Sequence, residues 1–238
     1  TKDSTIAGAD KPVLKSGGFT AGACETLLLY AQPELKAKRL LIIGIGKSVK
    51  VSLSEIRKAA GAAIRFAKPR SIREVTLVLP EHDAVPLAAA ARAAVEGAFV
   101  GDFDPDTYRS DRKDRSIEKF TVVAPASADK AAIESAFREG VIVGESQNFT
   151  RSLVNEPGNR LTPTVLGERA AAMCREQGLQ CEVHSTEKLK ELKMGAFWSV
   201  AQGSDEPPAL IVMRYEPANA PKDSPVLALV GKGITFDT

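Results

Sequence analysis

The order of the expected secondary structure elements predicts an α/β fold. Apolar runs of strand length alternate with helical patterns, giving strands over 40–45, 74–79 and 119–124 and helices over 52–67 and 85–100. Because a helix commonly serves as the crossover between two parallel strands, this alternation favours mainly parallel strands. An apolar fraction of 44% supplies enough side chains for a core, and a charged fraction of 26% is typical of globular proteins.

The first helix has clear boundaries in the sequence. Ser52 and Glu55 have the spacing of a capping box, in which the two side chains satisfy amide groups at the helix start, and Pro69 is expected to end the helix. Its apolar positions recur at helical spacing. They are Ile56, Ala59, Ala60, Ala63, Ile64 and Ala67. A short strand over Glu25–Tyr30 precedes these elements, and Pro86 lies in the first turn of the alanine-rich second helix.

A long helix is expected over 129–154. Gly140 and Gly144 lie on its apolar stripe, which indicates close backbone packing because glycine costs about 1 kcal/mol in a helix interior. We interpret this helix as a connector between two domains. The next helix is expected to have Thr162 as its N-cap, with Pro163 at its first position, and to end at Gly178.

The last third of the chain is expected to hold three strands and a short helix. The strands are Cys181–His184, Ala209–Tyr215 and Val226–Val230, and the helix is Thr186–Lys193. The second and third strands are apolar at successive positions, as buried central strands are.

Composition and charge exclude several classes of protein. The net charge of +2 provides no overall electrostatic footprint for nucleic acid. No apolar run reaches the ~18 residues of a membrane span, and no signal peptide is visible. Three cysteines without CxxC spacing indicate reduced, mostly buried thiols, as in the cytosol. The chain lacks an initiator Met and ends just after an apolar run, so we expect a fragment.

Two other motifs carry little chemistry. Gly44-Ile-Gly-Lys-Ser48 follows a strand, but a phosphate loop would need Gly at position 41, which is Leu, and a dinucleotide fingerprint would need Gly or Ala at position 49, which is Val. We interpret it as a strand-end turn. His82 and His184 are the only histidines, too few for a histidine-based zinc site.

The most informative segment is the tail from Val230 to Thr238. Lys232 follows a strand-like run between two glycines, and Asp237 lies five positions later. The pair fits either a strand-end salt bridge or a metal site with a neutral lysine amine as ligand. In a straight strand the two residues would lie about 16 Å apart on opposite faces, so a shared metal centre requires a bend, which Gly233 can supply. Two ligands are also too few for a catalytic divalent ion.

The same tail closely resembles the signature of the leucyl aminopeptidases, the cytosol aminopeptidase family. The segment from Asn148 to Pro163 resembles the start of that family's catalytic domain. The segments 195–204 and 208–215 resemble the strands that follow it, and Tyr108–Arg112 resembles a stretch of the N-terminal domain.

The resemblance implies an N-terminal mixed-sheet α/β domain over 1–130, followed by a connecting helix and the first part of an α/β catalytic domain over 131–238. It implies a cytoplasmic homohexamer that removes N-terminal residues such as leucine from peptides with two divalent metal ions, Zn or Mn. Lys232 and Asp237 would be metal ligands. The family's remaining carboxylate ligands and catalytic residues have no counterpart here, so no residue of this chain is assigned as catalytic.

Two alternatives stay open. The first is a regulatory or interaction domain that contacts DNA, although the near-neutral charge argues against strong binding. The second is a small-ligand domain that uses the turn after the strand over 40–45. Neither alternative involves a membrane.

Overall fold

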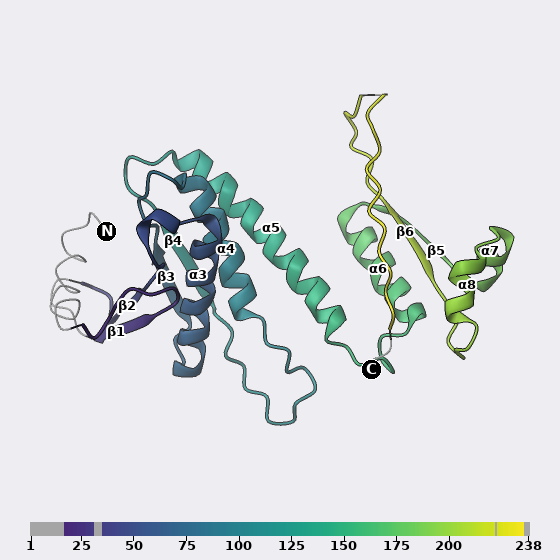
Figure 1. Ribbon diagram of the computed structural model, residues 1–238, viewed down its shortest axis with the longest axis horizontal. Coiled ribbons are helices and arrows are strands. Elements are labelled where there is room, and N and C mark those ends of the chain that lie inside the picture. Colours follow the sequence, from purple (N-terminus) through teal and green to yellow (C-terminus); the bar gives the residue numbers. More distant parts are fainter. Residues whose placement is uncertain (1–16, 31–34, 222, 236–238) are drawn as a thin grey trace. The chain divides into compact units, whose positions relative to one another are not determined.

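The structure is a computed structural model that describes residues 17–30, 35–221 and 223–235 (Figure 1). It has a mixed α/β architecture, as predicted. The chain divides into two compact units, Thr1–Arg151 and Ser152–Thr238, which are described separately below. This division falls near the C-terminal end of the long helix, and the domain boundary at 130/131 stays a prediction. In the described part of the chain, no helix is long and apolar enough to cross a membrane.

The first unit contains two small sheets. Strand β1 (Thr26–Tyr30) pairs antiparallel with β2 (Arg39–Ile43), and β3 (Glu74–Val78) pairs parallel with β4 (Lys119–Val123). The expectation of mainly parallel strands is therefore correct only for β3 and β4. The reason is connection length, because residues 31–38 are too few for the crossover that a parallel pair requires.

Helix α3 (Leu53–Ala67) buries the six residues that the sequence predicts. Its N-cap differs in detail from the expected capping box. The Ser52 hydroxyl hydrogen-bonds to the Glu55 carboxylate instead of accepting from a helix amide. The helix ends before Pro69 and continues as the 3₁₀ turn η2 (Lys68–Arg70), while another such turn, η1 (Ser48–Lys50), precedes it.

Small residues allow the helices of the first unit to pack closely. A Cβ atom on Gly97 of α4 (Leu87–Asp102) would overlap the Arg57 carbonyl oxygen of α3. On α5 (Lys130–Val154), a Cβ atom on Gly140 would lie 2.9 Å from Val95 Cβ. The prediction that the glycines of the long helix mark close packing is confirmed. The core lies where α3 and α4 meet, and Leu77 of β3 and Val122 of β4 pack against it. Figure 1 shows α3 and α4 side by side.

The second unit is built around helix α6 (Pro163–Gln177) and a two-stranded sheet. The Thr162 side chain accepts a hydrogen bond from Val165 N at 3.3 Å, and Gly178 ends the helix with φ +69°, as predicted. Strand β5 (Gln180–His184) pairs antiparallel with β6 (Leu210–Arg214), and the short helices α7 (Thr186–Glu191) and α8 (Gly195–Ala201) lie between them in the sequence.

Three strand expectations for this unit are wrong. The segment 195–204 begins with α8 instead of a strand. The prediction was wrong because the periodicity of a short apolar run does not distinguish a helix from a strand. Strand β6 is not a buried central strand, since Met213 is 53% exposed. Residues 226–230 are in no strand, and Val230 is 96% exposed. An extended segment requires a neighbouring strand to form a ladder, and the described strands provide none beside it.

Candidate functional site

The predicted metal ligands lie in the tail of the second unit. Lys232 is exposed, on an extended stretch after residues 226–230. A Cβ atom on Gly231 would meet no atom within 4 Å, and one on Gly233 would lie 4.0 Å from Leu166 Cδ2 of α6. Asp237 lies outside the described residues. The proximity of the two side chains, and the bend at Gly233 that it requires, therefore stay predictions.

Other metal donors do not gather in the described part of the chain. Within it, no group of three or more His, Cys, Asp or Glu side chains could hold a metal ion. His184 on β5 instead pairs with Glu182, with Nε2 and Oε2 3.2 Å apart. A lysine amine and a carboxylate are chemically suitable donors. They cannot complete a catalytic site alone, since such a site takes at least three protein ligands.

The turn before α6 is held together by a partly buried ion pair. Arg169 Nη2 of α6 donates to Glu156 Oε1 at 2.9 Å. The amides of Arg160 and Leu161 both donate to the Pro157 carbonyl oxygen, and the Leu161 side chain is buried. These contacts fix the entry of the chain into α6, the helix whose Leu166 lies nearest to Gly233.

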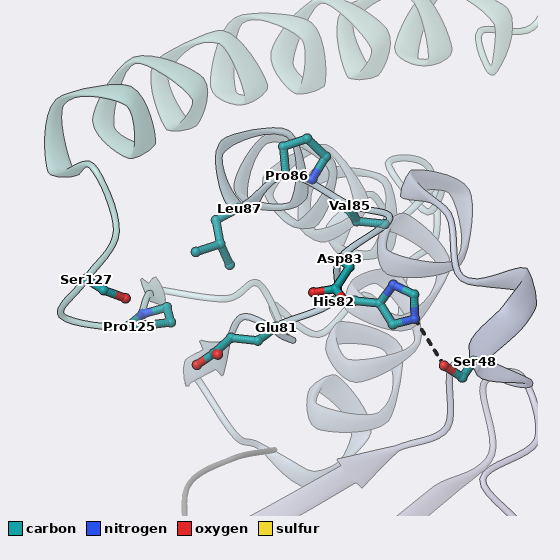
Figure 2. A pocket seen from close by; sticks show the side chains of 9 residues that line it. All are labelled: Ser48, Glu81, His82, Asp83, Val85, Pro86, Leu87, Pro125 and Ser127. Carbon is teal, nitrogen blue, oxygen red and sulfur yellow. Dashed lines mark hydrogen bonds between the residues drawn. The ribbon is translucent and has the colours of Figure 1, made fainter.

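The first unit has a cavity of ≈ 560 Å³ that the sequence did not predict (Figure 2). It lies beyond the carboxyl ends of β3 and β4, the edge at which open parallel sheets bind ligands. Its walls come from η1, from the segment before α4 and from the loop after β4. Figure 2 shows Pro125 and Ser127 on the side opposite to Ser48. The available signal was the polar sequence Glu81-His-Asp83 directly after a strand.

Ser48 and His82 in this cavity resemble a nucleophile and its base, but their hydrogen bonds argue against that role. Ser48 Oγ lies 3.0 Å from His82 Nε2, and the Ala84 amide donates to His82 Nδ1 at 3.2 Å. Since Nδ1 accepts a hydrogen bond, the proton of the neutral ring is on Nε2. The imidazole therefore donates to Ser48 and cannot accept its proton, as a catalytic dyad would require.

The glycines of the turn after β2 are explained by packing within the protein. Gly44 N donates to Glu25 O at 2.8 Å, and Gly46 N donates to Ala21 O at 3.1 Å. A Cβ atom on Gly44 would overlap the Gly22 carbonyl oxygen, and Gly46 has φ +79°. Both amides are thus used inside the fold and cannot bind a phosphate. This supports the interpretation of the segment as a strand-end turn and argues against a phosphate loop.

The charged loop after α4 offers little excess positive charge. Arg112 Nε lies 3.2 Å from Asp106 Oδ1, and Arg109 Nε lies 3.4 Å from Asp111 Oδ1. A DNA contact through this loop would have to break such pairs, and the DNA-contacting alternative stays an untested prediction.

Comparison with known protein families gives two matches in chain order. The model of the cytosol aminopeptidase family, N-terminal domain, matches residues 2–112. The model of the cytosol aminopeptidase family, catalytic domain, matches residues 148–238. The two matches flank the segment that contains most of α5.

Curated relatives match over the whole chain. A probable cytosol aminopeptidase from Acidobacterium capsulatum is 57% identical over 238 residues, which is 100% of this chain and 47% of that protein. Another from Koribacter versatilis is 48% identical, over 100% of this chain and 49% of that protein. The chain thus spans about half the length of these relatives.

Solved structures share the fold. The bottromycin maturation enzyme BotP in complex with Mn matches with a TM-score of 0.73 and 29% identity, over 86% of this chain and 42% of that chain. A mutant of tomato leucine aminopeptidase matches with a TM-score of 0.78 and 24% identity, over 92% of this chain and 43% of that chain. The second likeness concerns the fold alone.

Proposed function

Since this chain belongs to the cytosol aminopeptidase family, we propose that it supplies the N-terminal part of a metal-dependent leucyl aminopeptidase. The complete protein would remove N-terminal residues such as leucine from peptides. The observation that carries this proposal is the order of the two family matches, N-terminal domain over 2–112 and catalytic domain over 148–238. The second match includes the tail with Lys232 and Asp237.

In this proposal Lys232 and Asp237 are ligands of two divalent metal ions, zinc or manganese. The Mn complex of BotP supports divalent metals as a class. A neutral lysine amine donates a lone pair without adding negative charge, so a metal held by Lys232 stays a stronger Lewis acid than one held by a further carboxylate. When bound, the ions would polarise the peptide carbonyl and lower the pKa of a coordinated water. The other ligands must come from residues beyond those described.

Family membership also supports a cytoplasmic homohexamer as the working form. Sedimentation of the complete protein would test the hexamer directly.

The experiment uses a fusion protein. It consists of this chain followed by the part of the Acidobacterium capsulatum relative that this chain does not match. Lys232→Ala is compared with Lys36→Ala, which changes an exposed lysine of the first unit. Bound metal is measured by mass spectrometry after dialysis, and turnover is measured with leucine p-nitroanilide. We expect Lys232→Ala to lose one metal ion per chain and to lower turnover by at least roughly 100-fold, since even outer-shell changes cost 10–100-fold.

The Lys36→Ala protein should keep both its bound metal and its turnover. The 238-residue chain alone should show no turnover, because its donor set is incomplete. Unchanged metal content and turnover in Lys232→Ala would contradict the ligand role, and an inactive fusion protein with full metal content would contradict the peptidase assignment.

A further inference from the structure

Two of the three cysteines face each other inside the second unit. Cys174 is in α6 and is fully buried, while Cys181 is in β5 and is partly exposed. Cys24 belongs to the first unit and is exposed. The expectation of mostly buried thiols is therefore correct only for Cys174, and the adjacency of Cys174 and Cys181 was not predicted.

The turn at the end of α6 brings the two cysteines together. Gly178 adopts φ +69°, and the Leu179 amide donates to the Cys174 carbonyl oxygen at 2.7 Å. This arrangement is a Schellman turn, which reverses the chain direction and satisfies a helix-end carbonyl. Strand β5 consequently begins two residues after Gly178. The chain then runs back along α6.

A second contact between the helix and the strand fixes which faces meet. A Cβ atom on Gly167 would lie 2.7 Å from Val183 Cγ1. Residues seven apart share a face of a helix, so Cys174 is on the same face as Gly167. Residues two apart share a face of a strand, so Cys181 is on the same face as Val183. The two cysteines therefore lie on the faces of helix and strand that meet, and Cys174 is close enough to Cys181 to raise the pKa of its thiol.

The surroundings keep the more accessible thiol protonated. Burial raises the pKa of Cys181, and the neighbouring Cys174 thiol and the Glu182 carboxylate raise it further. A thiol reacts as its thiolate, so the raised pKa slows the attack of Cys181 on an oxidant.

We propose that Cys174 and Cys181 are a dithiol modification site that closes into a reversible disulfide when a small-molecule disulfide is the oxidant. The partly exposed Cys181 thiolate attacks one sulfur of the oxidant, which forms a mixed disulfide and releases one thiol. The buried Cys174 thiolate then attacks Cys181 Sγ, which forms the Cys174–Cys181 bond and releases the second thiol. The two protein thiols lose two protons and two electrons, and the oxidant gains them.

The experiment uses the 238-residue chain and oxidised glutathione. After incubation the remaining thiols are alkylated with N-ethylmaleimide under denaturing conditions, so that buried Cys174 is also counted, and the protein is digested with trypsin. Cleavage after Arg169, Arg175 and Lys188 separates the two cysteines into peptides 170–175 and 176–188. We expect these peptides to be linked by a disulfide, with a loss of two alkylatable thiols that dithiothreitol reverses.

Three variants test the order of the steps. Cys24→Ser should keep the link, and Cys181→Ser should lose it and leave Cys174 alkylated. Cys174→Ser should accumulate glutathione on Cys181, because the second attack is absent. The proposal is overturned if glutathione reaches only Cys24 while Cys174 and Cys181 stay alkylatable in the unmodified sequence, or if Cys181 links to Cys24 or to another copy. The unmodified chain gives this answer even if a variant fails to fold.

Discussion

Gly97 of α4 rests directly on the Arg57 carbonyl of α3, with no room between them for a side chain. A Cβ atom at Gly97 would overlap that oxygen and would also lie 3.1 Å from the Ala60 methyl group. Backbone and side chain of α3 thus block the same position. The close approach of the two helices at this point therefore requires a residue without a side chain at position 97.

The first prediction concerns this contact. Gly97→Ala should lower the free energy of unfolding by about 1–3 kcal/mol, because the clash with backbone exceeds the gain in helix propensity. Gly195→Ala is the matched control, since Gly195 is also helical but a Cβ atom there would meet nothing within 4 Å. Urea unfolding of both variants provides the comparison. Equal stabilities for the two would show that α3 and α4 can separate at little cost.

The second prediction concerns Asp104 and the buried Lys68. Lys68 is 4% exposed, and its Nζ lies 2.7 Å from Asp104 Oδ2 and 3.0 Å from Asp102 Oδ1. Burial alone would raise the pKa of Asp104, but the hydrogen bonds and positive charges of Lys68 and Arg65 outweigh it and lower the pKa below 3.8. The stabilisation from this carboxylate is therefore present above the ordinary Asp pKa and is lost as the pH falls through the lowered value.

Asp104→Asn should accordingly cost about 1–3 kcal/mol at pH 7, the range for a hydrogen bond to a charged group. Asp111→Asn is the control, since its pair with Arg109 is 70% or more exposed on both side chains and such pairs contribute little. Unfolding measured from pH 7 down to acid pH should show the Asp104→Asn difference shrinking below the ordinary pKa. A difference that grows in acid would refute the assigned direction.

The third prediction concerns the N-cap of α6. Thr162→Ala removes the oxygen that accepts from Val165 N and should cost about 1 kcal/mol. Thr162→Ser retains the hydroxyl and should restore most of this loss. Thermal unfolding followed by circular dichroism measures both variants, and identical melting temperatures for the alanine and serine variants would mean that the cap contributes nothing.

The fourth prediction concerns the Ser48–His82 contact. Because Nδ1 of His82 accepts from Ala84 N, the ring donates to Ser48 and does not activate it. A fluorophosphonate reagent should therefore leave Ser48 unmodified in intact protein, as judged by peptide mass spectrometry. Labelling that disappears in His82→Ala would instead reveal an activated serine.

The sequence predicted local elements well and long-range partners poorly. The buried face of α3 and the end of α6 at Gly178 follow from helical spacing and from glycine's tolerance of positive φ, both of which are local properties. The antiparallel pairing of β1 and β2 and the isolation of residues 226–230 depend on which strands lie nearby.

The same contrast between local and long-range properties applies to the candidate sites. Lys232 and Asp237 could be predicted as metal ligands because the short segment 230–238 resembles a family signature, and this prediction stays untested. The cavity of Figure 2 could not be predicted because it is formed by segments that the fold gathers from separate parts of the first unit. The contact between Cys174 and Cys181 likewise depends on a turn that folds β5 back onto α6.

The exposed segment from Val226 to Val230 has a consequence for handling the isolated chain. Its apolar side chains face solvent, from 83% exposure at Leu227 to 96% at Val230. Extended apolar segments with unpaired amides are templates for intermolecular β-pairing. At high concentration the isolated chain is therefore prone to aggregate through this segment. Leu229→Lys should reduce this aggregation.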